Sequence, residues 1–139
     1  MNRERPVSEF ARMVPELIKD GQTVSFYPKG SSMNPVIKEG DSVTLASFDK
    51  LRKYDIVLFL KDGEKAILHR VVKVNNDKTY VMQGDSKAVK EFGITEENVV
   101  AKVIFINKKD KKIKTSGIFF YVRSFLILHL RYIKRALKF

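Results

Sequence analysis

Apolar residues follow a helical period near both ends of this chain and a strand-like pattern between them. Over residues 7–20 they recur at intervals of three and four, which predicts an N-terminal helix that Gly21 ends. Pro15 lies inside this run. Because proline lacks a backbone N–H and clashes with the preceding turn, we expect it to bend or split the helix.

The middle of the chain, residues 23–107, consists of short apolar and β-branched runs separated by turn signals. "DIVLFL" and "AILHRVVKV" flank "KDGEK", a combination typical of a β-hairpin. About six closely spaced strands are expected, whereas the polar stretch "GDSKAVKEFGITEEN" is expected to be irregular or briefly helical. This pattern predicts a mainly β protein with a small mixed or coiled sheet, and not a layered fold of alternating strands and helices.

The C-terminal region divides into two parts. Residues 108–117 are charged and end in glycine, which indicates a linker. Residues 118–139 follow a helical period and present aromatic and aliphatic side chains on most faces. One arc of this helix carries the basic residues Arg123, Arg131, Lys134, Arg135 and Lys138. The chain is therefore expected to comprise an N-terminal helical segment (1–22), a β domain (23–107), a charged linker and a basic amphipathic helix.

The net charge of +11 is concentrated in the C-terminal region. Residues 102–139 hold 11 Lys and Arg against one acid, whereas residues 1–101 hold 16 basic and 15 acidic residues. Cations interleaved with Phe, Leu and Ile favour a helix that lies on an anionic membrane surface. Arg123 and Arg131 interrupt the apolar run, which disfavours a membrane-spanning helix. Docking of the helix on the body and homo-oligomerisation through it are the alternatives.

The composition excludes several kinds of site. The chain has no cysteine, so disulfides, thiolate zinc sites and cysteine nucleophiles are excluded, and no cofactor or metal is expected. The N-terminal stretch "MNRERPVSEF" is not followed by an apolar run, so no signal peptide is expected. A nucleic-acid partner is disfavoured because no helix-turn-helix pattern precedes the basic segment. We expect a protein that associates peripherally with the cytoplasmic side of a membrane.

Two adjacent serines stand between a glycine and a methionine in "KGSSMNPVIKEGD", residues 29–41. A serine hydroxyl becomes a nucleophile only where a neighbouring base accepts its proton. The chain offers two histidines, His129 in the C-terminal helix and His69 in a strand of the body. On the pattern alone, His69 is more simply interpreted as a core histidine, because it shares a strand face with Ile67 and Val71.

The combination of "GSSMNPVIKEGDSV", "HRVVKV" and "QGDS" resembles the signal peptidase I superfamily, which also includes the self-cleaving phage and SOS repressors. The family pattern Gly-x-Ser-Met-x-Pro, followed by Gly-Asp, is matched at six positions: Gly30, Ser32, Met33, Pro35, Gly40 and Asp41. The resemblance covers about residues 24–106 and implies a β-rich catalytic domain. It selects Ser32 over Ser31 as the nucleophile, because the family's nucleophile directly precedes the methionine.

The resemblance also assigns the base and its orienting acid. Where bacterial-type members and repressors carry a lysine base, this chain has His69, as in the histidine-base variant typified by endoplasmic-reticulum-type signal peptidases. Histidine has an ordinary pKa of ~6.5 and accepts a proton near neutral pH without the desolvation that lysine needs. Asp85, in a second Gly-Asp motif, is the first choice for the acid that orients the ring, and Glu91 is the second.

Support for the site is expected from the loop that carries Ser32, residues 29–41, which we call the serine loop. Many signal peptidases have a serine two places before the nucleophile, but this chain has Gly30 there, as the repressors do. Backbone N–H groups, above all that of Ser32, are therefore expected to form the oxyanion hole. Met33 is expected to pack beneath the site.

The function expected from the sequence is that of a serine endopeptidase. It would cleave a peptide or precursor protein near a membrane through an acyl-enzyme. The alternative is a catalytically inactive member of the same family that acts as a peptide-binding or membrane-associated accessory protein. A basic nucleic-acid-binding module is the least favoured class.

Overall fold

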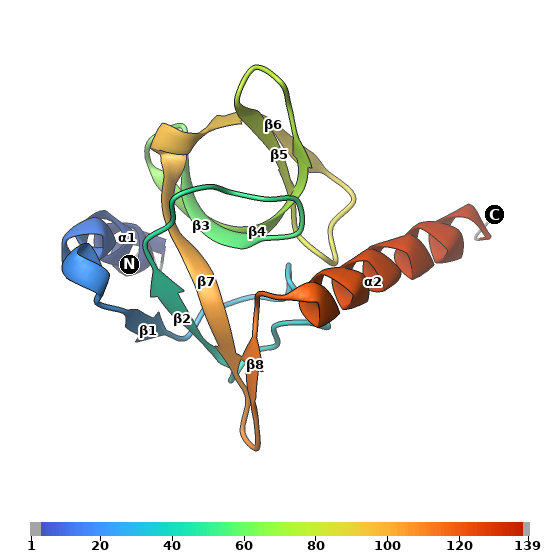
Figure 1. Cartoon of the computed structure of the whole chain (residues 1–139), viewed down its shortest axis with the longest axis horizontal. Helices are drawn as coiled ribbons and strands as arrows, with labels where there is room; N and C mark the ends of the chain where they lie inside the picture. The colour runs from blue at the N-terminus through green and yellow to red at the C-terminus, as the bar shows by residue number, and fades with distance from the viewer. Residues whose placement is uncertain (1–3, 138–139) are drawn as a thin grey trace.

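One curled antiparallel sheet with a helix at each end forms the protein in the computed structural model, which describes residues 4–137 (Figure 1). The mainly β fold predicted from the sequence is confirmed. The elements in chain order are α1 (Glu4–Leu17), the 3-10 turn η1 (Lys19–Gly21), β1 (Val24–Phe26), β2 (Ser42–Ala46), β3 (Ile56–Lys61), β4 (Lys65–Val74), β5 (Thr79–Gln83), β6 (Lys90–Thr95), the 3-10 turn η2 (Glu96–Asn98), β7 (Val99–Asn107), β8 (Lys112–Lys114) and α2 (Ile118–Ala136).

The strands are ordered β1-β2-β7-β3-β4-β5-β6, and β8 also pairs with β7. The predicted β3–β4 hairpin is confirmed, with Lys61 opposite Lys65. Its turn contains Asp62 and Gly63 at φ of 54° and 72°, a conformation that Asp and Gly tolerate. Figure 1 shows that the sheet curls strongly through β3 to β6.

The N-terminal helix differs from the expectation at Pro15. The helix α1 runs through this proline and ends two residues later, at Leu17. Because Pro15 stands in the last turn, its missing N–H removes one backbone hydrogen bond and the helix ends soon after without being split. Ala11, Val14 and Ile18 from this segment are buried against the sheet.

Two segments that the sequence indicated as irregular or linking contain strands. The polar stretch over residues 84–98 contains β6, which pairs with β5, and the charged residues 108–117 contain β8, which pairs with β7. Both strands are rich in Lys, Glu or Gly, so they lack the apolar run that marks a strand in a sequence. Their pairing follows from the hairpins that join them to the preceding strands.

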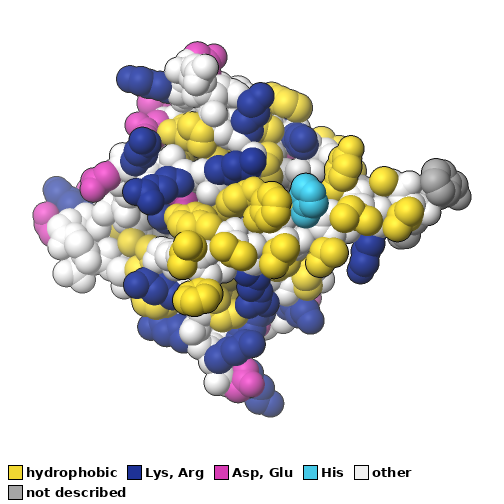
Figure 2. Space-filling model, turned by 45° about the vertical axis from the view of Figure 1, so that its right-hand side comes forward, with side chains coloured by type: hydrophobic (Ala, Val, Ile, Leu, Met, Phe, Trp, Pro, Cys, Tyr) yellow, Lys and Arg dark blue, Asp and Glu magenta, His cyan; other side chains and the backbone are white. Residues whose placement is uncertain are grey.

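The helix α2 is docked on the body along one stripe and exposed elsewhere. Phe120 and Ser124, one turn apart, are buried, and Arg131 continues the stripe. Figure 2 shows apolar side chains along the helix. The exposed apolar residues of this segment are Ile118, Phe119, Val122, Phe125, Leu126, Leu130, Tyr132, Ile133 and Leu137. Over residues 4–137, no helix is long and apolar enough to cross a membrane. Lys138 and the side chain of Arg135, both expected on the basic arc, lie outside what the structure describes.

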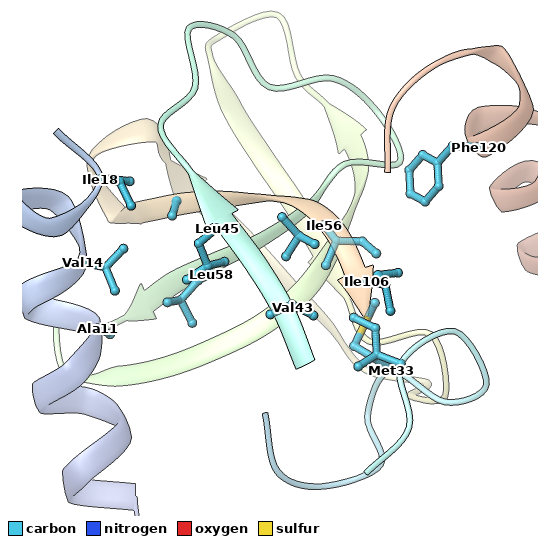
Figure 3. Packing of buried hydrophobic residues seen from close by; sticks show 13 residues of the cluster. Ala11, Val14, Ile18, Met33, Val43, Leu45, Ile56, Leu58, Ile106 and Phe120 are labelled. Atoms are coloured by element: carbon cyan, nitrogen blue, oxygen red, sulfur yellow. The ribbon is translucent and has the colours of Figure 1, made fainter. Parts of the chain in front are cut away.

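Both helices and the loop between β1 and β2 share one apolar core (Figure 3). Val14 from α1 and Phe120 from α2 approach the same cluster of strand residues from different sides. Met33, from the β1–β2 loop, is 4% exposed and belongs to this cluster. The loop that carries the candidate nucleophile is therefore anchored in the core by the residue that follows Ser32.

Candidate active site

A cleft of about 390 Å³ opens where the β1–β2 loop faces the first half of β4. Ser32, Gly30 and Met33 line it from the loop, and His69 lines it from β4. Glu91, from β6, contributes to the same cleft. Five of the six residues that the sequence indicated for the site thus meet in one depression, although they come from three distant parts of the chain.

A glycine at one end of the serine loop and a carboxylate at the other help to fix its shape. Gly30 has a φ of 92°, in the left-handed region that favours glycine. At the far end of the loop, the N–H of Lys38 donates to Asp41 Oδ2 across 2.9 Å, and the Lys108 ammonium binds the same oxygen. Burial alone would raise the pKa of Asp41, but these hydrogen bonds and positive charges outweigh it and lower the pKa. Asp41 therefore holds the loop as an ionised carboxylate.

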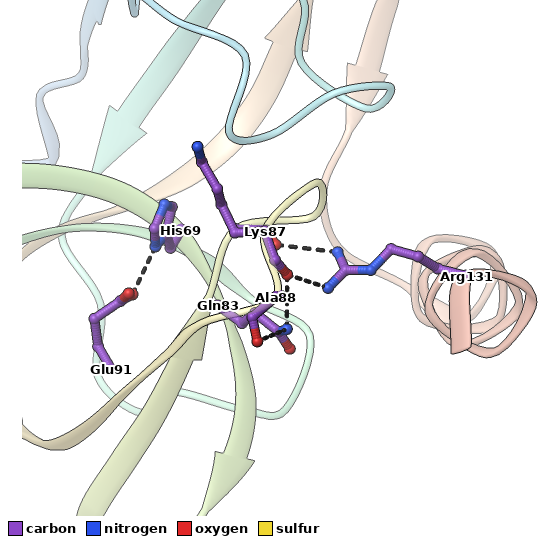
Figure 4. A network of polar contacts seen from close by, with 7 residues as sticks. His69, Gln83, Lys87, Ala88, Glu91 and Arg131 are labelled. Carbon is purple, nitrogen blue, oxygen red and sulfur yellow. Dashed lines mark hydrogen bonds and ion pairs between the residues drawn. The ribbon is translucent and has the colours of Figure 1, made fainter. Parts of the chain in front are cut away.

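His69, on β4, is held by a carboxylate from β6, two strands away in the sheet. Its Nδ1 donates to Glu91 Oε1 across 2.6 Å, and each side chain is 10% exposed (Figure 4). A carboxylate can only accept a hydrogen bond, so this contact selects the tautomer with hydrogen on Nδ1. The other ring nitrogen, Nε2, then carries a lone pair that can accept a proton.

Gly84 brings the serine loop against that nitrogen. A Cβ atom at this position would lie 2.7 Å from the carbonyl oxygen of Ser32 and 2.9 Å from His69 Nε2. Ser86 fastens the same contact, because its N–H donates to the Ser32 carbonyl across 2.9 Å and its hydroxyl donates to the Ser31 carbonyl across 2.6 Å. The Gly-Asp-Ser turn therefore holds the carbonyl of residue 32 close to Nε2. The space at Gly84 between these two groups is too small for a methyl group.

The Ser32 hydroxyl is not bonded to His69 in this conformation: among the described residues no hydrogen bond joins the two side chains. Hydrogen bonds between a catalytic serine and its base are often long or misaligned without substrate and shorten when substrate binds. The N–H of Gly30 is engaged by Glu39 Oε1 at 3.2 Å. This leaves the backbone N–H of Ser32 as the oxyanion donor nearest to the nucleophile.

Asp85, the first choice for the orienting acid, has a different partner. Arg70 Nε and Nη2 donate to its two carboxylate oxygens across 2.8 and 2.7 Å, and both side chains are fully buried. Successive strand residues point to opposite faces, so His69 faces the cleft while Arg70 faces away from it. The structure places Glu91, the second choice, at the imidazole.

The C-terminal helix contacts the turn that supports the site. Arg131 donates to the carbonyl oxygen of Gly84 across 3.1 Å and to that of Lys87 (Figure 4). Nearer the start of the helix, the Ser124 hydroxyl accepts a hydrogen bond from Arg70 Nη1 across 2.7 Å. The helix thus touches both the Gly84 turn and the buried arginine that holds Asp85.

Three supporting residues were not recognised from the sequence: Arg70, Ser86 and Arg131. Arg70 directly follows His69 and Ser86 directly follows the second Gly-Asp pair, so the quoted motifs contained both of them. A signal for Arg70 was available, because a charged residue in the middle of an apolar strand requires a buried partner. Nothing in the sequence pattern distinguished Arg131 from the other cations of the helix.

Comparison with known proteins gives one family. A family model described as peptidase S24-like matches residues 4–104, which include α1, the serine loop, His69 and the Gly84 turn. No curated protein matches the chain.

Proposed function

Because the chain belongs to the peptidase S24-like family, we propose that it is a serine endopeptidase with Ser32 as nucleophile, His69 as base and Glu91 as the orienting acid. The observation that carries this proposal is the position of the imidazole. Its Nδ1 is bound to a carboxylate, and its Nε2 lies against the loop that bears Ser32. Acyl transfer requires an acid at one ring nitrogen and the nucleophile within reach of the other, and these two contacts support such an arrangement.

The reaction follows from these positions. As Ser32 Oγ attacks the peptide carbonyl carbon, its proton passes to His69 Nε2, and the imidazolium is stabilised by the Glu91 carboxylate. The Ser32 N–H donates to the oxyanion that forms. Collapse of this intermediate breaks the C–N bond, and His69 returns the proton to the departing amine. Water, deprotonated by His69, then attacks the ester, which releases the acid and restores the Ser32 hydroxyl.

A peptide can reach Ser32 along the open edge of β4. The strand β5 pairs with β4 from Arg70 onward, and among the described residues no strand pairs with that side of the segment from Lys65 to His69. An unpaired strand edge presents backbone donors and acceptors to an extended peptide. The residues Ala66, Ile67 and Leu68 of this edge line the cleft that contains Ser32.

The acyl-enzyme provides a direct test. An alanine-rich peptide mixed with the protein and quenched rapidly in acid is expected to leave its N-terminal fragment covalently attached, and mass spectrometry of a digest should place the adduct on Ser32. Ser31→Ala is the matched control and should form the same adduct, because Ser31 supplies only a backbone carbonyl to the Ser86 contact. An adduct on Ser31, or an undiminished adduct in Ser32→Ala, would exclude the assignment.

An inactive peptide-binding role is the second candidate. It is favoured by one observation, the absence of a hydrogen bond between Ser32 and His69 among the described residues. The two candidates separate in a single experiment, a comparison of the wild-type protein with Ser32→Ala. An inactive member would bind peptide equally well in both forms, and neither form would release shortened products.

We place the proposed activity at a membrane surface because of α2. Its exposed face carries a wide band of apolar side chains together with the exposed cations Arg123 and Lys134. A helix of this composition binds anionic bilayers by burying the apolar face while the cations meet the headgroups. The docked stripe of the helix remains against the body in this arrangement.

Membrane binding can be tested without damaging the body. Removal of the whole helix would take Phe120 and Ser124 out of the packed interior, so point substitutions on the exposed face are preferable. The double variant Phe119→Ser/Leu130→Ser is expected to bind anionic vesicles about tenfold more weakly in a sedimentation assay, because less apolar area enters the bilayer. Phe92→Ser is the control, since Phe92 is also well exposed but lies on β6. Equal losses for both variants would contradict a membrane role of α2.

A further inference from the structure

Lysines surround the cleft that contains Ser32 and His69. Of the residues that line it, five are exposed lysines: Lys29, Lys38, Lys61, Lys65 and Lys87. Among the described residues, Glu91 is the one acid in the lining, and it is bound to His69. The cleft therefore has a strong excess of positive charge on its rim.

This excess is local and does not follow from the overall composition. Residues 1–101 contain 16 basic and 15 acidic residues. When the five cleft lysines and Glu91 are set aside, the remaining 11 basic and 14 acidic residues carry a small negative charge. No described residue of the basic C-terminal helix belongs to the lining. Nearly a third of the Lys and Arg residues in positions 1–101 thus line this one cleft.

The lysines come from three separate parts of the chain and face the cleft from different sides. Lys29 and Lys38 stand on the serine loop, Lys61 and Lys65 at the hairpin end of β3 and β4, and Lys87 on the turn after Gly84. Lys65 also takes part in an interaction within the protein, so the variants tested below leave it unchanged.

Two acids of the serine loop, Glu39 and Asp41, are engaged by other groups of the protein. Glu39, in the same loop, accepts the N–H of Gly30. Asp41 binds Lys108 and the N–H of Lys38. Both carboxylates thus fasten the loop, and neither lines the cleft.

We propose that the peptide cleaved here is acidic, with Asp or Glu residues flanking the scissile bond, and that the cleft lysines select it. This inference rests on the peptidase function proposed above. A strand laid along β4 advances about 3.3 Å per residue, so the four-residue step from His69 to Lys65 brings the hairpin lysines within reach of a side chain about four positions from the cut bond. Lys87, on the turn after Gly84, lines the cleft that contains Ser32 and His69 and can meet an acid close to the bond.

The expected size of the preference follows from the exposure of the lysines. Charge pairs in contact with water are individually weak and screened by salt. A concave site lined by one sign of charge concentrates the field and raises the association rate of oppositely charged ligands. Several lysines acting together should therefore give about a tenfold preference at low salt.

Three quenched fluorescent peptides test the proposal directly. They share an alanine-rich core and differ only in carrying Glu, Gln or Lys at the flanking positions. With the wild-type protein, kcat/KM is expected to be about tenfold higher for the Glu peptide than for the Gln peptide, lowest for the Lys peptide, and nearly equal for all three at high salt. Equal values for the Glu and Gln peptides at low salt would overturn the proposal.

Matched variants assign the effect to the cleft. Lys29→Gln/Lys61→Gln should remove most of the preference for the Glu peptide. Lys109→Gln/Lys111→Gln removes the same charge from the β7–β8 hairpin, outside the cleft, and should leave the preference intact. Equal losses in the two variants would mean that the net charge, and not the cleft, selects the peptide, and would also overturn the proposal.

Binding separates this proposal from the peptidase function. Ser32→Ala should bind the Glu peptide more tightly than the Gln peptide in fluorescence anisotropy, whether or not the wild-type protein cleaves either. Selective binding without cleavage by the wild-type protein supports the acidic-peptide site and removes the peptidase function. Cleavage without any selectivity, in turnover or in binding, supports the peptidase function and excludes the acidic-peptide site.

Discussion

Ser32→Ala is expected to lower kcat for peptide cleavage on the order of 10⁴-fold, and His69→Ala by a similar factor. Without Oγ no acyl-enzyme can form. Without the imidazole, the Ser32 hydroxyl keeps its proton and remains a weak nucleophile. KM should change little in either variant, because the edge of β4 and the lysine rim are untouched.

The double variant makes this prediction sharper. In the proposed mechanism Ser32 and His69 share one proton transfer, so Ser32→Ala/His69→Ala should be no slower than the slower single variant. Multiplied losses would indicate that the two side chains act independently and would contradict the dyad. Thermal unfolding of each variant is the control, since Ser32 is held by its backbone carbonyl and its replacement should leave the unfolding midpoint unchanged.

Glu91→Gln is expected to lower kcat on the order of 10³-fold with little change in KM. Glutamine is close to glutamate in size, but its amide group can donate a hydrogen bond to Nδ1 and so favour the tautomer with hydrogen on Nε2. That tautomer cannot accept the Ser32 proton. The loss of the carboxylate also leaves the imidazolium without its countercharge.

Asp85→Asn is the matched comparison, because it changes the other acid that the sequence offered. It should reduce the unfolding free energy by about 3 kcal/mol, since Arg70 would keep a buried charge with a neutral partner. The kcat of the folded fraction should stay close to that of the wild-type protein. A loss of kcat confined to Asp85→Asn, with Glu91→Gln fully active, would reverse the roles assigned to the two carboxylates.

Much of the fold could be predicted because its central strands have a strong local pattern. The β3–β4 hairpin is two apolar runs around Asp-Gly, and burial along most of β3 leaves one arrangement for it. The edge strands β6 and β8 escaped prediction because their residues are polar and their pairing depends on neighbours. The expectation for Pro15 was wrong because the effect of a proline depends on its position in the helix. The sequence pattern placed the end of the helix three residues too late, which put Pro15 in its interior and not in its last turn.

Only those features of the site that appear as short sequence motifs could be predicted. The motifs identified Ser32, His69, Asp85 and Glu91 as candidate site residues. They could not decide which of the two acids contacts the imidazole. The ranking depends on strand direction: β6 turns Glu91 toward the cleft, while Asp85 points to the opposite side and meets Arg70. A motif gives the spacing of residues and gives no account of which face of the sheet each one occupies.

The close approach at Gly84 also offers a way to classify relatives without any assay. Any side chain at that position would have to displace the imidazole or the carbonyl of residue 32, which accepts the N–H of Ser86. A homologue that keeps the serine and the histidine but has lost this glycine would retain the architecture and the groove while its chemistry was switched off. Under the proposed mechanism, the residue at position 84 therefore bears on whether a relative can work as a peptidase, alongside the serine and the histidine.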